Sequence, residues 1–120
     1  MNVIKLYSGD NSPLYFIYIF QGGNKMRKII TFCGSTRFRE LFHSLASEYT
    51  LMGWIVLMPH CYYEHDSRPD LKDLLVDIHH DMIAMSDAVL IINKDGYIGK
   101  STEEEIKYAK SLNKEIKYYE

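Results

Sequence analysis

Short apolar runs alternate with amphipathic segments along residues 26–120, and this alternation constrains the fold more than any other feature. The runs cover residues 28–33, 54–58, 88–92 and 114–119. Runs of this length that are rich in β-branched and aromatic residues are typical of strands. Strands that are apolar throughout and separated by helices indicate a parallel sheet with both faces covered. The sequence therefore predicts an α/β fold, a Rossmann-like three-layer sandwich around a mostly parallel sheet of four to five strands.

Three helices are predicted between these runs. The first has apolar side chains at steps of three and four, namely Phe38, Leu41, Phe42, Leu45 and Tyr49, and Gly53 ends it. The second is expected over residues 71–85, with one apolar side formed by Leu71, Leu74, Leu75, Ile78, Met82 and Met85. The third begins at Ser101 and Thr102. Residues 60–70 are polar and aromatic and are expected to form a loop, with turn residues at 67–70.

Residues 1–25 differ from the rest of the chain. They contain a cluster of aromatic residues without clear periodicity, followed by Gly22, Gly23 and Met26. In-frame translation of a purine-rich ribosome-binding site and its start codon produces this kind of sequence. We therefore expect residues 1–25 to be an upstream extension and residues 26–120 to be the domain. The alternative is a genuine strand, at residues 14–20, added to the edge of the sheet.

The bulk composition excludes several classes of protein. The chain has 120 residues, enough for one small domain that would benefit from forming a homodimer or a larger homo-oligomer. A formal net charge of -2 argues against binding a nucleic acid polymer, which needs a basic stripe. No apolar run approaches the roughly 20 residues of a membrane span. The two cysteines lack zinc-ligand spacing and are expected to be free thiols in a cytoplasmic protein.

Parallel sheets of this kind bind ligands beyond the carboxyl ends of their strands, near the point where the strand order reverses. Three segments should lie there: residues 33–37, 59–63 and 93–102. Together they supply the candidate substrate-binding residues Cys33, Gly34, Ser35, Arg37, Pro59, Asn93, Gly96, Tyr97, Ser101 and Thr102. The segment Gly34-Ser35-Thr36-Arg37 places a glycine, two hydroxyl groups and a guanidinium at a predicted helix start, which favours binding of an anion. A tight turn with a Ser or Thr cap explains the same residues without a ligand.

Three consecutive glutamates follow Thr102. Ser101 with Glu104, or Thr102 with Glu105, has the spacing of a capping box, and acidic residues suit the first turn of a helix. This structural interpretation accounts for Glu103 and Glu104. The functional interpretation is that one carboxylate points into the cleft. Because a helix N-terminus favours the ionised form, that carboxylate suits a nucleophile better than a general acid.

Other polar residues favour structural roles. Asp87 precedes the strand at residues 88–92 and should cap or form a turn. The neighbouring His79 and His80 face different sides of a helix, so one packed and one solvated histidine is favoured over a metal site. Tyr62 and Tyr63 suit either base stacking or an ordinary aromatic loop.

The most specific motif covers residues 101–109, Ser-Thr-Glu-Glu-Glu-Ile-Lys-Tyr-Ala. Together with Gly34-Ser35-Thr36-Arg37, Ser86-Asp87 and the strand that follows, it resembles the nucleoside 2-deoxyribosyltransferase-like superfamily, especially its small bacterial and phage members. The resemblance extends over residues 28–118. It implies that Glu105 is the nucleophile, since this position matches the family's glutamate.

The resemblance further implies a retaining double displacement on the N-glycosidic bond of a nucleoside or nucleotide. A second carboxylate usually orients the nucleophile in this family, and Asp81 or Asp77 is the nearest candidate, although the spacing to Asp87 departs from the family pattern. No cofactor or metal is implied. The alternative function is a non-catalytic nucleotide-binding module, in which Glu105 is only a helix-terminal charge.

Overall fold

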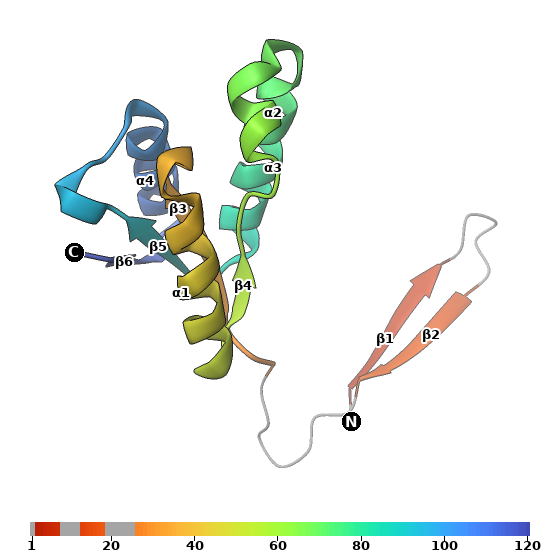
Figure 1. The fold of residues 1–120 in the computed structure, drawn as a ribbon. Helices are drawn as coiled ribbons and strands as arrows, with labels where there is room; N and C mark the ends of the chain where they lie inside the picture. Colours follow the sequence, from red (N-terminus) through yellow and green to blue (C-terminus); the bar gives the residue numbers. More distant parts are fainter. Residues whose placement is uncertain (1, 8–12, 19–25) are drawn as a thin grey trace.

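The computed structural model describes residues 2–7, 13–18 and 26–120, and it contains two separate sheets (Figure 1). In the smaller sheet β1 (Asn2–Tyr7) pairs antiparallel with β2 (Pro13–Tyr18). The alternative strand at residues 14–20 is therefore present in part as β2, but it pairs with β1 instead of extending the larger sheet. Residues 19 and 20 lie outside the described part of the chain, and the upstream-extension hypothesis stays a prediction.

The larger sheet has four parallel strands in the order β4-β3-β5-β6. They are β3 (Ile29–Gly34), β4 (Ile55–Leu57), β5 (Ala88–Ile92) and β6 (Glu115–Tyr118). The predicted α/β, Rossmann-like fold is thereby confirmed. The strand order reverses between β3 and β5, because β4 lies on one side of β3 and the later strands lie on the other.

Helices cover both faces of this sheet. They are α1 (Arg39–Leu51), α2 (Tyr62–Ser67), α3 (Lys72–Met85) and α4 (Lys100–Ser111), with short 3-10 turns η1 (Thr36–Phe38), η2 (Pro69–Leu71) and η3 (Lys94–Gly96). Right-handed crossovers that run in opposite directions along a sheet put their helices on opposite faces. The β3-α1-β4 connection runs one way, and the connections through α3 and α4 run the other.

The side chains of the two central strands alternate between two apolar cores. Ile30 and Phe32 of β3 pack toward α1, where they meet Phe42, whereas Cys33 lies on the other face with Ile83 of α3. This alternation follows from the two-residue period of a strand. It also explains why both faces of β3 and β5 had to be apolar.

Two predictions for residues 54–70 need correction. The strand at residues 54–58 was expected to be buried, but β4 is a three-residue edge strand, and Ile55 is 39% exposed. The expected loop at residues 60–70 contains α2 as well as η2. A helix of six residues is too short to show helical periodicity in the sequence.

The predicted apolar side of the second helix is only partly correct. The helix is present as α3, but Leu74, Ile78 and Met85 are exposed. The helix rests on the sheet through His79 and Ile83, which are displaced by one residue, or about 100°, from the predicted stripe.

Gly34 lies at the carboxyl end of β3 and is required by close packing. A Cβ at this position would lie 2.9 Å from the Ile92 carbonyl oxygen and 3.1 Å from Ile92 Cβ on β5. Because a backbone atom cannot move aside cheaply, we expect Gly34→Ala to lower the free energy of unfolding by about 1–3 kcal/mol in urea denaturation. Gly99→Ala is the matched control, since its Cβ would meet the flexible end of Tyr97 at 3.3 Å. An unchanged midpoint for Gly34→Ala would contradict this packing.

Candidate functional site

A cavity of about 410 Å³ opens at the carboxyl edge of the sheet, where the strand order reverses. Its walls come from the loop after β3, the β4-α2 segment, α3 and the first turns of α4. The lining residues are Gly34, Ser35, Thr36, Pro59, His60, Cys61, Tyr62, His65, Leu75, Val76, Ile78, His79, Met82, Tyr97, Gly99, Lys100, Ser101, Thr102 and Glu105. This volume lies in the range of small-molecule binding sites.

Glu105 is the buried carboxylate of this cavity. It lies in the second turn of α4 and is 9% exposed. Its Oε1 atom accepts hydrogen bonds from His79 Nδ1 at 3.2 Å and from Ser101 Oγ at 3.5 Å. Its Oε2 atom is buried and has no hydrogen-bond partner in the part of the chain that the structure describes. One oxygen is therefore held in place, whereas the hydrogen-bonding capacity of the other is unused within the described residues.

His79 of α3 joins Glu105 to the central strand. Its Nε2 donates to the Phe32 carbonyl oxygen at 2.9 Å, and its Nδ1 faces Glu105. A carbonyl and a carboxylate only accept hydrogen bonds, so each ring nitrogen donates and the imidazole is positively charged. Burial opposes this charge, but the hydrogen bond to Glu105, the Glu105 charge and the Phe32 carbonyl outweigh it, and the pKa of His79 is raised.

Cys33 lies beneath the cavity at the end of β3. Its side chain is fully buried, and Sγ is 3.8 Å from His79 Nε2. Burial, reinforced by the charge of Glu105 and a hydrogen bond to it, raises the pKa of this thiol well above its ordinary value. Cys33, His79 and Glu105 bring three potential metal-ligand atoms within 4.8 Å of one another.

Sequence reasoning missed His79 as a site residue. It was expected to be one of a structural pair with His80, and only His80 is free of the site, its ring stacked on Tyr108 at 4.6 Å. Nothing in the local sequence distinguishes the two histidines. His79 becomes a site residue because α3 and α4 pack on the same face of the sheet.

Most of the predicted binding residues do line the cavity: Gly34, Ser35, Pro59, Tyr97, Ser101 and Thr102. Arg37 lies just outside, with its guanidinium 3.8 Å from the centre of the Tyr97 ring. It borders a smaller hollow of about 310 Å³ that shares Ser35 and Thr36 with the main cavity and also contacts Arg39 and Asp66.

Besides Arg37, four predicted residues do not line the cavity, and one of them is the fully buried Cys33. Asn93 is buried. Its Nδ2 donates to the Glu120 carbonyl oxygen at 3.1 Å, and its Oδ1 accepts from the Glu120 N–H at 2.9 Å, so it anchors the segment that follows β6. Gly96 lies on the η3 turn. Asp81, the predicted second carboxylate, is exposed on α3, because two residues along a helix correspond to a rotation of about 200° from His79. His79, and not Asp81, contacts Glu105.

The capping box is not formed. The N-cap of α4 is Gly99, and Ser101 lies inside the helix, where its hydroxyl donates to Glu105 instead. Asp87 was expected to cap or form a turn, but its structural role is different: its Oδ2 accepts from the backbone N–H of Ile29, at the start of the neighbouring strand β3, at 2.8 Å.

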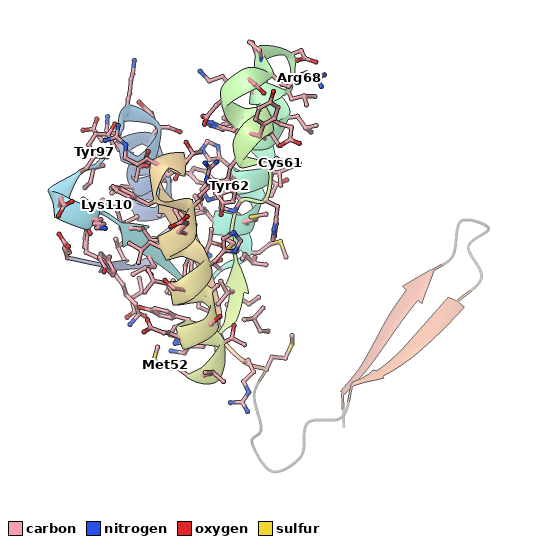
Figure 2. The ribbon with its side chains drawn as sticks, in the orientation of Figure 1. Met52, Cys61, Tyr62, Arg68, Tyr97 and Lys110 are labelled. Carbon is pink, nitrogen blue, oxygen red and sulfur yellow. The ribbon has the colours of Figure 1, made fainter. Side chains whose placement is uncertain are left out.

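Tyr62, at the start of α2, supplies a second unsatisfied group (Figure 2). Its hydroxyl is buried without a hydrogen-bond partner among the described residues, and burial raises its pKa, so it stays a neutral phenol. Its ring makes edge contacts with Phe42 and His43. The ring therefore serves packing, and the hydroxyl and Glu105 Oε2 are the buried side-chain polar atoms without a hydrogen-bond partner in the described part of the chain.

No protein-family model and no curated protein matches this chain. Among the described residues, no helix is long and apolar enough to cross a membrane. Inferences about function therefore depend on the cavity and its buried carboxylate.

Proposed function

We propose that this protein cleaves or transfers the N-glycosidic bond of a nucleoside, deoxynucleoside or 5′-monophosphate, with Glu105 as the nucleophile. The observation that carries the proposal is the state of the Glu105 carboxylate. Oε1 is held by His79 and Ser101, Oε2 is buried without a partner among the described residues, and Glu105 is a lining residue of the cavity. Leaving a buried polar atom unpaired costs about 1–3 kcal/mol, which suits an atom that a substrate will use.

The reaction requires two displacements. Glu105 Oε2 attacks the anomeric carbon, the bond to the base nitrogen breaks, and the base leaves with its electron pair and takes up a proton. This step forms an ester between the sugar and Glu105. A water molecule, or a second base, then attacks the same carbon, loses a proton and restores the carboxylate. The anomeric configuration is retained because it is inverted twice.

The surroundings of Glu105 suit this role. His79 places a positive charge next to the carboxylate and holds its orientation through the Phe32 carbonyl. Leu75, Val76 and Met82 of α3 provide an apolar wall against which a planar base can pack. His79 acts through Glu105 and is a positioning residue in this scheme.

Arg37 is proposed to read the 5′-phosphate. It shares a hollow with Arg39, beside the Ser35 and Thr36 that line the main cavity. We expect Arg37→Ala to weaken binding of a nucleoside 5′-monophosphate about ten- to a hundredfold, because a charged hydrogen-bond pair contributes about 1.5–3 kcal/mol. Binding of the free nucleoside should change little, as measured by isothermal titration calorimetry.

The control for this prediction is Arg68→Ala. Arg68 follows the last residue of α2 and pairs with Asp70, whereas Tyr62 lies at the other end of this helix (Figure 2). Its removal should leave both affinities unchanged. Equal losses for the phosphorylated and free ligands in Arg37→Ala would show that Arg37 does not read phosphate.

The experiment that tests the proposed function is a release assay. The purified protein is incubated with nucleosides and 5′-monophosphates, with and without a second free base, and products are separated by chromatography. Free base indicates a hydrolase, and an exchanged nucleoside indicates a transferase. If no product forms but one ligand raises the melting temperature, the protein is a nucleotide-binding module instead.

A further inference from the structure

Three chemically different donors meet at the wall of the cavity. They come from three elements: Cys33 from β3, His79 from α3 and Glu105 from α4. Their donor atoms all lie within 4.8 Å of one another. Cys33 is fully buried, and the side chains of His79 and Glu105 are each 11% exposed. Such a convergence of thiol, imidazole and carboxylate is more than the proposed glycosidic chemistry needs.

The donor set matches the preferences of one class of metal ion. Zinc and similar thiophilic divalent cations bind sulfur, imidazole nitrogen and carboxylate oxygen, and sites with three protein ligands leave a fourth position open. Magnesium and calcium prefer oxygen ligands alone, so the thiol disfavours them.

The spacing of the donors also fits. Ligands about 2.0–2.3 Å from a tetrahedral ion lie roughly 3.3–3.6 Å from each other. His79 Nδ1 and Glu105 Oε1 are 3.2 Å apart, and Cys33 Sγ is 3.8 Å from the other nitrogen of the same ring. All three residues offer donor atoms within 4.8 Å of one another, so a side-chain movement at Cys33 would complete the coordination triangle.

The contact on the far side of His79 supports the same conclusion. A histidine that binds a metal through one nitrogen usually donates its other N–H to a carbonyl or carboxylate, which sets the ring orientation. His79 Nε2 donates to the Phe32 carbonyl at 2.9 Å and leaves Nδ1 facing Glu105. His79 and Glu105 line the cavity, which provides both an entry path and space for a fourth ligand.

We propose that Cys33, His79 and Glu105 form a binding site for one thiophilic divalent cation, of which Zn²⁺ is the representative. The ion displaces one proton from Cys33 Sγ and one from His79 Nδ1, which pass to solvent, and takes these two atoms and a Glu105 carboxylate oxygen as ligands. The cavity supplies the open position. A consequence that rests on the proposed function is that the ion inhibits glycosidic cleavage, because it occupies the nucleophile.

The test is titration of the chelator-treated, full-length protein with Co²⁺, a spectroscopic substitute for Zn²⁺. We expect a thiolate-to-cobalt charge-transfer band that saturates at one ion per chain and disappears when Zn²⁺ is added. The band should be lost in Cys33→Ala, and the affinity should fall at least tenfold in His79→Gln and in Glu105→Gln. Circular dichroism establishes that each variant is folded.

Each variant has a matched control in this chain. Cys61→Ser removes the other cysteine, which also lines the cavity, His80→Gln removes the neighbouring histidine, and Glu104→Gln removes a neighbouring exposed glutamate. These three should keep the band and the affinity. If the wild type shows no thiolate band at saturating Co²⁺, or if Cys61→Ser abolishes it, the proposed site is wrong. The presence or absence of the thiolate band in the wild-type protein tests the site even if a Cys33 variant fails to fold.

Release assays with and without Zn²⁺ separate this proposal from the proposed function. Zn²⁺ binding together with loss of base release supports both. If base release depends on Glu105 in a protein that binds no Zn²⁺ or Co²⁺, the metal site is overturned and the enzyme stands. If Zn²⁺ binds at the three residues but base release continues unchanged, the metal site stands and Glu105 is not the nucleophile.

Discussion

Glu105→Gln is expected to reduce base release by about a thousandfold or more, which corresponds to at least about 4 kcal/mol of the activation barrier. Glutamine has nearly the same size as glutamate and keeps an oxygen that can accept from His79 or Ser101. A neutral amide, however, is a far weaker nucleophile than a carboxylate and cannot form the glycosyl ester. The measurement is single-turnover release of base from the best substrate of the panel.

The control for this variant is Glu104→Gln. Glu104 precedes Glu105 on the same helix but is exposed, so it shares the local sequence without the cavity. Its activity should equal that of the wild type. A folded Glu105→Gln protein that keeps wild-type base release would refute the assignment of the nucleophile, and equal losses in both variants would indicate a general effect on α4.

His79→Ala is expected to cost about 3 kcal/mol of the free energy of unfolding, measured by urea denaturation near pH 6. The substitution removes both hydrogen bonds of the imidazole and leaves the buried Glu105 carboxylate without its positively charged partner. Breaking a buried ion pair from one side typically costs about 3–5 kcal/mol, because the remaining charge is uncompensated. His80→Ala, which loses a ring contact with Tyr108 and no hydrogen bond shown in the described part of the chain, should cost much less.

The contribution of His79 to the free energy of unfolding should also decrease as the pH rises. Its folded-state pKa is raised, whereas an unfolded histidine titrates near about 6.5. Its charge therefore contributes fully to stability below about pH 6.5, and this contribution is lost as the pH rises through the folded-state pKa. The difference in unfolding free energy between wild type and His79→Ala should shrink from pH 6 upward. A difference that grows with pH would contradict a charged His79.

A double-mutant cycle tests whether the two effects share one cause. In Glu105→Gln the carboxylate charge is already absent, so adding His79→Ala should cost less than it does in the wild type. We expect a coupling of about 1–3 kcal/mol, as is found for residues in direct contact. Additive effects would show that His79 stabilises the protein without acting on Glu105.

The apolar runs at residues 28–33 and 88–92 were enough to predict the two central strands, because a strand buried on both faces needs apolar residues throughout. The apolar run at residues 54–58 was less informative, since an apolar composition does not distinguish a central strand from the edge strand β4. Similarly, the periodicity of residues 71–85 predicted a helix but misplaced its buried side. That side depends on which face of α3 meets the sheet, and His79 is part of it.

The sequence by itself determined the order of strands and helices and the presence of a carboxylate-bearing helix after the third apolar run. Local propensity and periodicity carry this information, because they depend on neighbouring residues. Only the tertiary structure decided which side chains surround Glu105. Cys33 and His79 are 46 residues apart in the chain, and His79 and Glu105 are 26 apart. They meet because crossovers of one hand place α3 and α4 on the same face of the sheet, beside the end of β3, and no local pattern in the chain encodes that contact.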